Sequence, residues 1–186
     1  LDGVTGVQTC ALPISPAMEG AAVEEGAAPE RVRAEIAAGR AVLPANPRHV
    51  HLRPAVAGRA FRTKVNANIG CSAHCSDESQ ETRKLETALQ AGADFVMDLS
   101  VGSDVTRIRR KLLSVAPVPL GTVPIYEALF RVDGRTEELT PELLIAVIRG
   151  QAEEGVDFMT LHAGLLRRHL PLALKRKLGI VSRGGA

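Results

Sequence analysis

The stretch KVNANIG, residues 64–70, carries the strongest indication of how this chain folds. Its apolar residues alternate with polar ones at the period of two that is typical of a β-strand. Asparagine is disfavoured in sheets and needs hydrogen-bond partners when it is buried. The pair Asn66 and Asn68 on one face therefore indicates either a strand that runs into a turn or a strand whose end opens into a polar pocket.

The same pattern returns further along the chain, where apolar stretches run into one or two polar side chains. Four more strands are predicted, at Phe95–Ser100, Val118–Val123, Phe158–His162 and Gly179–Ser182. Helices are predicted between them, from cap Asp77 to about Gln90, from cap Ser103 to about Leu113, a short one to about Arg131, and from cap Thr140 to about Glu154. This alternation predicts βαβ units and a parallel sheet.

Two α/β architectures fit such a sheet. A doubly wound sheet usually carries a glycine-rich turn after its first strand, and GxGxxG is absent here. A (β/α)8 barrel of the TIM type carries its functional residues at the carboxyl ends of several strands, which is the observed distribution. We therefore predict an incomplete (β/α)8 barrel of about five strands, preceded by a small helical and extended N-terminal segment.

The composition excludes several classes of protein. A net charge of +2 gives no broad electrostatic attraction to nucleic acid or to an anionic membrane. No apolar run approaches the roughly 20 residues that span a bilayer. Three cysteines in 186 residues do not predict a disulfide scaffold, so a reducing cytoplasm is expected.

Three segments can be distinguished along the chain. Residues 1–15 contain GVQTCALPIS, which looks like translated sequencing adaptor, and we interpret them as an artefact without a part in the fold. Residues 16–62 form an N-terminal segment with a helix over Glu30–Ala38 and a proline-rich stretch. Residues 63–186 form the first part of the barrel, and we interpret the whole chain as a fragment of a longer protein.

Several residues at the predicted strand ends have both a structural and a functional interpretation. Ser182, Arg183 and Gly184 form either an anion cradle or an ordinary glycine-rich turn. His162 is more often a hydrogen-bonded core residue than a catalyst, and Tyr126 could simply pack at a strand exit.

The remaining polar candidates carry weaker signals. Met97 alone is most simply core filling, and Asp98 is either a buried partner of a basic group or a pocket acid. Cys71, His74 and Cys75 lie too close together for an ordinary zinc site. No role is predicted for the two histidines at positions 49 and 51.

Taken together, the predicted strands resemble one known family. The segments are LPANPRH, RTKVNANIG, GADFVMDLS, APVPLGTVPIYEAL, GVDFMTLHAG and GIVSRGG. They resemble the phosphomethylpyrimidine synthase (ThiC) family of thiamine biosynthesis, in family order from about Val32 to Gly185. The resemblance implies a radical S-adenosylmethionine carbon–carbon lyase that converts 5-aminoimidazole ribotide into 4-amino-2-methyl-5-(phosphomethyl)pyrimidine. It also implies a homodimer with a central (β/α)8 barrel and an external electron donor.

The resemblance further implies which residues touch the substrate. They are Asn68, Met97, Tyr126, His162, Ser182, Arg183 and Gly184. For Met97 this replaces the interpretation as core filling. The loop Cys71–Cys75 departs from the small polar residues usual in the family. The family's two metal-binding histidines, for a zinc-type divalent metal, and its C-x2-C-x4-C motif, for a [4Fe–4S] cluster, are not in this sequence. We therefore expect no metal or catalytic residue in the fragment and no activity from it alone.

Two rival functions remain. A 5-hydroxybenzimidazole synthase of the anaerobic cobamide pathway would look similar and use the same ribotide. The second rival is a non-catalytic ribotide-binding barrel that has lost its cluster region.

Overall fold

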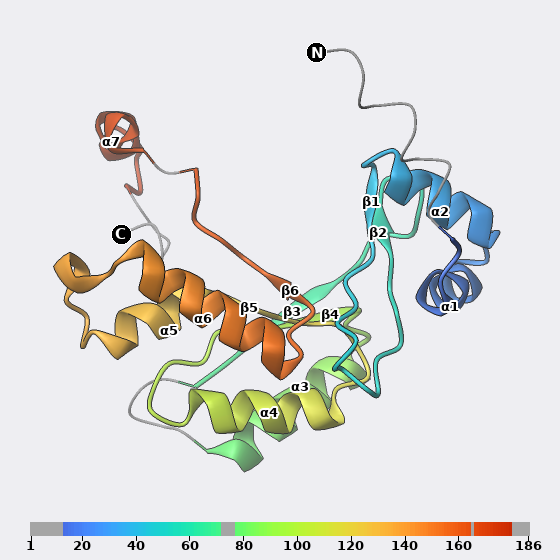
Figure 1. Cartoon of the computed structure of the whole chain (residues 1–186), viewed down its shortest axis with the longest axis horizontal. Helices are drawn as coiled ribbons and strands as arrows, with labels where there is room; N and C mark the ends of the chain where they lie inside the picture. The colour runs from blue at the N-terminus through green and yellow to red at the C-terminus, as the bar shows by residue number, and fades with distance from the viewer. Residues whose placement is uncertain (1–12, 72–76, 165, 180–186) are drawn as a thin grey trace.

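A computed structural model describes residues 13–71, 77–164 and 166–179 of the chain. Its centre is a parallel sheet of four strands in the order β3-β4-β5-β6. The strands are β3 (Asn66–Ile69), β4 (Phe95–Asp98), β5 (Leu120–Thr122) and β6 (Phe158–Met159). Spatial order follows chain order, and each crossover between strands contains helix (Figure 1). The predicted α/β class and parallel sheet are confirmed.

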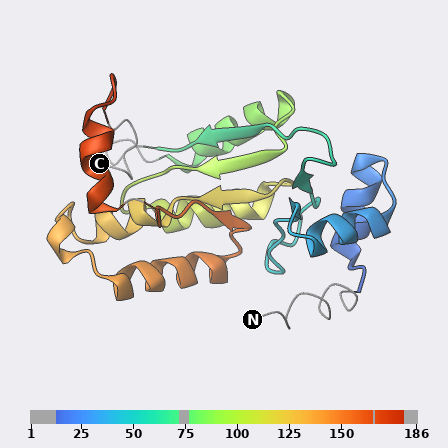
Figure 2. The same cartoon turned by 90° about the horizontal axis from the view of Figure 1, so that it is seen from above.

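One face of this sheet is covered by helices. The helices are α3 (Glu78–Gln90), α4 (Val105–Val115), α5 (Pro124–Arg131) and α6 (Pro141–Glu154). Ile69, Val96 and Leu120 point from the sheet into a core that also contains side chains of α3 and α4. Seen from above, the strands lie in front of α3 and α4, so the opposite sheet face is open to the viewer (Figure 2). The helices therefore bury one face only.

Local signals explain where the helices begin and end. Asp77 caps α3 by accepting a hydrogen bond from the Ser79 N–H at 2.9 Å, as predicted. Thr140 caps α6 through the Leu143 N–H at 3.2 Å, and Gly155 ends that helix in the left-handed region at φ 113°. The predicted cap Ser103 is wrong, because the residue before α4 is Asp104, whose side chain makes no capping bond.

The N-terminal segment forms a small unit of its own beyond the amino ends of the strands (Figure 2). It contains α1 (Pro16–Glu25), α2 (Pro29–Ala37) and an antiparallel ribbon of β1 (Ala41–Val42) and β2 (Ala57–Gly58). Its core is built from Met18, Ala21, Ala22, Val32, Ala41 and Val56. Helix α2 agrees with the prediction, whereas α1 has no predicted counterpart. The cap of α1 is Ser15, which accepts from the Met18 N–H at 3.3 Å and belongs to the stretch interpreted as adaptor.

The last part of the described chain departs from the prediction. The strand predicted over Phe158–His162 forms only over Phe158–Met159. Beyond it, the described residues form one turn of 3-10 helix, η2 (Arg167–His169), and a five-residue helix, α7 (Leu170–Leu174). The predicted fifth strand, Gly179–Ser182, lies almost entirely outside the described residues. Within the described ranges, no helix combines the length and the apolar character needed to cross a bilayer.

Candidate functional site at the carboxyl ends of the strands

The first two candidate residues lie side by side. Asn68 on β3 is the register partner of Met97 on β4, and Met97 is in turn the partner of Gly121 on β5. Register partners in a parallel sheet point to the same face, and side chains alternate between faces along a strand. Since Ile69 and Asp98 point toward the helices, Asn68 and Met97 belong to the open face.

An apolar floor continues this open face. The Phe158 ring lies against Gly121 so closely that a Cβ at position 121 would overlap it. Phe158 also meets Phe95 edge to face, with ring centroids 5.8 Å apart. The Thr160 hydroxyl lies 3.9 Å from the Met97 sulfur. Met97 therefore lies at the border between aromatic rings and exposed polar groups, which suits contact with a ligand that has both characters.

The two asparagines of β3 provide hydrogen-bonding groups at the same face. The Asn66 amide donates to the Asn68 carbonyl oxygen at 2.9 Å, and both residues are exposed. A side-chain amide can donate two hydrogen bonds and accept at its oxygen. Asn68 is therefore oriented by its neighbour while its own amide protons can reach a ligand.

Tyr126 and His162 follow the next two strands. Tyr126 lies in the first turn of α5, four residues after the last residue of β5, and is half-buried. His162 lies three residues beyond β6 and is exposed. Asn68 and Met97 thus lie within β3 and β4, whereas Tyr126 and His162 follow β5 and β6. The carboxyl ends of these four neighbouring strands meet at one edge because the strands are parallel. Their roles in binding stay predictions.

The remaining predicted positions are only partly visible. Ser182, Arg183 and Gly184 lie outside the described residues, as do His74 and Cys75. Cys71 is buried, and its N–H donates to the Ser100 hydroxyl at 3.1 Å. Among the described residues, no group of three histidine, cysteine or acidic side chains could hold a metal ion. The chain's cysteines, at positions 10, 71 and 75, also lack the spacing of a [4Fe–4S] motif, so they do not fit that cluster.

Asp98 lies behind the sheet and not in the open face. Its side chain is buried and accepts a hydrogen bond from the Ser100 N–H at 2.9 Å. Burial raises the pKa of Asp98, against the opposing effects of Ser100 and the Arg109 charge. Asp98 is thus a buried carboxyl on the helix side of the sheet, away from Asn68 and Met97, and the charge of Arg109 acts on it from a distance.

A buried polar network behind β5 has no counterpart in the sequence predictions. The Thr122 hydroxyl donates to the Gln151 Oε1 at 2.6 Å, and the Gln151 amide donates to the Glu127 Oε2 at 2.7 Å. Arg109 binds the same carboxylate oxygen at 3.0 Å. These residues come from β5, α4, α5 and α6, so only tertiary structure brings them together.

A second unpredicted network fastens the N-terminal segment to the amino ends of the strands. His49 donates from Nδ1 to Asp157 Oδ2 at 2.7 Å and from Nε2 to the Ala116 carbonyl at 2.8 Å. Asp157 also accepts from the N–H groups of Asn46 and Leu120, each at 2.8 Å. Burial opposes the imidazolium, but the hydrogen bond and charge of Asp157 outweigh it and raise the pKa of His49.

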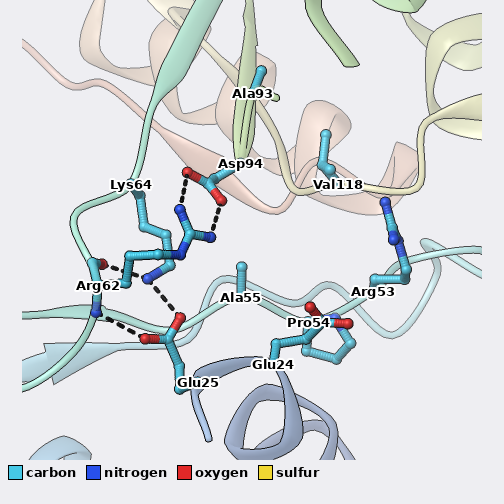
Figure 3. Close-up of a pocket in the computed structure, with 10 residues that line it drawn as sticks. All are labelled: Glu24, Glu25, Arg53, Pro54, Ala55, Arg62, Lys64, Ala93, Asp94 and Val118. Carbon is cyan, nitrogen blue, oxygen red and sulfur yellow. Dashed lines mark hydrogen bonds and ion pairs between the residues drawn. The ribbon is translucent and has the colours of Figure 1, made fainter. Parts of the chain in front are cut away.

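A cavity of about 100 Å³ lies at this amino end, between the N-terminal unit and the sheet (Figure 3). The Arg62 guanidinium forms two hydrogen bonds with the Asp94 carboxylate. Lys64 pairs with Glu25 of α1 at 2.7 Å, and both side chains are almost completely buried. Both cations are thus already paired with carboxylates, and these ion pairs connect the N-terminal unit to the sheet.

Known proteins resemble this chain over most of its length. Residues 8–186 match the family described as the radical SAM ThiC family. The chain belongs to this family. It is 54% identical over 173 residues to the phosphomethylpyrimidine synthase of Natronomonas pharaonis, covering 93% of the chain and 36% of that protein. The phosphomethylpyrimidine synthase of Halobacterium salinarum is 53% identical with the same coverage. The chain therefore spans about a third of the length of these relatives. The family match includes residues 8–15, which belong to the stretch interpreted as adaptor.

Proposed function

We propose that the chain is part of a phosphomethylpyrimidine synthase that converts 5-aminoimidazole ribotide with S-adenosylmethionine. The observation that carries this proposal is the family match over residues 8–186, together with 54% identity to an enzyme of that name. The family description supports radical chemistry with S-adenosylmethionine and an iron–sulfur cluster in the full-length protein. The activity, substrate and partners below belong to that full-length protein.

The proposal includes a (β/α)8 barrel of which this sheet is the first part. Two features support it: the strand order β3-β4-β5-β6 never reverses, and helices cover only one face. A doubly wound sheet reverses its strand order at the ligand site and has helices on both faces. In a barrel, the uncovered face with Asn68 and Met97 would become the interior.

In this proposal the ribotide is bound at the carboxyl ends of the strands. Its ribose and imidazole are polar rings with exchangeable protons, which suit the side chains of Asn68, Tyr126 and His162. Met97 and the Phe158 ring offer an apolar surface for the flat face of the imidazole. Ser182, Arg183 and Gly184 would hold the phosphate, since a guanidinium grips phosphate oxygens in pairs.

The other parts of the proposal rest on the family resemblance. They are a [4Fe–4S] cluster, a zinc-type divalent metal, a homodimer, an external electron donor and a cytoplasmic location. The three cysteines of this chain do not fit the cluster, so the proposed role of its side chains is substrate binding. The cluster and the divalent metal would be held by residues of the full-length protein other than the described residues of this chain.

The decisive experiment uses the full-length gene product with a reconstituted cluster. We expect it to bind 5-aminoimidazole ribotide and to release a pyrimidine phosphate with cleavage of S-adenosylmethionine, detected by mass spectrometry. A benzimidazole product would instead favour the 5-hydroxybenzimidazole synthase. Ribotide binding in calorimetry without S-adenosylmethionine cleavage would favour the non-catalytic barrel.

A matched pair of variants tests the phosphate contact. Arg183→Ala in the full-length enzyme should weaken ribotide binding at least tenfold, because a charged pair with phosphate is lost. Arg176→Ala removes an equal charge from the exposed segment nearby and should leave the affinity unchanged. Equal affinities of the two variants would remove Arg183 from the site.

A further inference from the structure

The buried network behind β5 holds the turn that carries Tyr126. Glu127, the next residue, is buried, and its carboxylate has three partners from three helices. Its Oε2 lies 3.0 Å from Arg109 Nη1 of α4 and 2.7 Å from Gln151 Nε2 of α6. Its Oε1 lies 2.6 Å from Arg131 Nη2 of α5 itself. The first turns of α5 are therefore fixed to both neighbouring helices through one side chain.

Gln151 fixes the other end of the same turn. Its Oε1 accepts from the hydroxyl of Thr122, the last residue of β5, at 2.6 Å, while its amide reaches Glu127. Gln151 is only 2% exposed. One side chain of α6 thus spans the segment from Thr122 to Glu127, and Tyr126 lies within that segment.

Because these side chains are buried, the geometry of the network is restricted. A buried amide or hydroxyl that loses its partner is left unsatisfied, so the network favours one geometry over nearby ones. The partners differ in their geometric requirements, since Gln151 must accept from one neighbour and donate to the other. A shift of the α5 start relative to β5 would break at least one of these bonds.

We propose that Gln151 and Thr122 are positioning residues that hold Tyr126 in its orientation toward the ribotide. This inference rests on the proposed function, because Tyr126 must contact the substrate for its position to matter. It goes further by assigning a substrate-affinity role to two buried residues on the helix side of the sheet. Glu127, which is itself paired with Arg109, accepts the hydrogen bond that fixes the Gln151 amide.

The test uses the full-length enzyme and titrates 5-aminoimidazole ribotide in a calorimeter. Thr122→Val keeps the shape of the side chain and removes its hydroxyl, while Thr122→Ser keeps the hydroxyl. We expect Thr122→Val, Gln151→Leu and Tyr126→Phe each to weaken ribotide binding about tenfold. Thr122→Ser should bind like the wild type.

A double variant separates positioning from general destabilisation. If Gln151 acts through Tyr126, Gln151→Leu combined with Tyr126→Phe should bind no more than about twofold more weakly than the weaker single variant. His49→Gln disturbs a buried network at the opposite end of the sheet. It should lower the melting temperature and leave the ribotide affinity unchanged.

The outcomes distinguish this inference from the proposed function. Wild-type affinity of Thr122→Val and Gln151→Leu, with Tyr126→Phe impaired, would overturn the positioning roles alone. Additive losses in the double variant would also overturn them. Wild-type affinity of Tyr126→Phe would remove Tyr126 from the site and the inference with it, while pyrimidine formation would still support the proposed function. A wild-type enzyme that binds no ribotide would overturn both.

Discussion

The two ends of the parallel sheet differ in how their polar side chains are used. At the amino end, His49 and Asp157 are completely buried and bonded to each other, and Lys64 and Glu25 neutralise one another. At the carboxyl end, Asn68 and His162 are exposed. In the proposed barrel, the amino ends of the strands would serve stability and the carboxyl ends would serve substrate binding. Polar groups satisfied by the protein thus hold it together, whereas exposed ones are available to a ligand.

The largest effect is expected from breaking the amino end. Asp157→Ala removes the acceptor of three hydrogen bonds and leaves the buried His49 ring without its carboxylate. The full-length enzyme should lose about 3–5 kcal/mol of unfolding free energy. Denaturant unfolding measures the loss. Ribotide affinity of the folded fraction should stay unchanged, and a large loss of affinity would contradict the division of labour.

The next effect concerns the backbone at the carboxyl end. Gly70 has φ 147°, and a Cβ there would lie 2.7 Å from the backbone of Leu99 and Ser100. Gly70→Ala should cost about 3 kcal/mol, since it adds a steric clash to backbone strain. Gly92→Ala is the matched control, because Gly92 also has positive φ but a Cβ added there would meet no atom within 4 Å. It should cost about 1 kcal/mol.

Both glycine variants are measured by thermal unfolding and ribotide titration. Gly70→Ala should also weaken ribotide binding, because Gly70 follows directly after the strand that carries Asn68. Equal stability losses in the two variants would show that the close approach at Gly70 has no energetic weight.

A smaller effect is expected from pH at the amino end. The pKa of His49 is raised in the folded state, so its protonation stabilises the protein below the ordinary histidine pKa of about 6.5. This contribution is lost as the pH rises through the raised value. Between pH 6 and pH 9, the wild type should therefore lose more unfolding free energy than His49→Gln. Parallel stability curves for the two proteins would exclude His49 as the titrating group.

The smallest stability effect is expected at the open face. Asn66→Ala and Asn68→Ala change exposed side chains, so each should alter the unfolding free energy by no more than about 0.5 kcal/mol. Asn68→Ala should weaken ribotide binding by about tenfold, since Asn68 is the predicted contact. Asn66→Ala should weaken it less, because it removes only the hydrogen bond that orients Asn68. Equal losses of affinity in the two variants would contradict the prediction that Asn68 is the contact and Asn66 only its hydrogen-bond partner.

Local sequence signals predict the elements that position the site. The alternation in residues 64–70 indicates β3, and the cap Thr140 with Gly155 indicates both ends of α6. These signals succeed because a strand's period and a helix's caps are encoded within a few residues. The α/β class follows from the order of such elements, whereas the family comes from the resemblance of the strand motifs.

Other features depend on contacts that no local signal encodes. No role is predictable for His49 because its partner Asp157 lies 108 residues away. The Gln151 network escapes prediction for the same reason, since a glutamine late in a helix normally faces solvent. Helix α1 escapes it because Ser15, its cap, belongs to the first fifteen residues, which look foreign to the fold. The predicted substrate contacts come from the resemblance to family motifs and not from periodicity, spacing or helix caps.

The contact between Gly121 and Phe158 has a consequence for how this surface can change over generations. Position 121 has no room for a side chain while the aromatic ring lies against it. A methyl group at position 121 would push the Phe158 ring out of its contact with Phe95, whereas a smaller residue at position 158 would remove the overlap beforehand. Mutational paths that reshape this floor are therefore favoured when position 158 changes first.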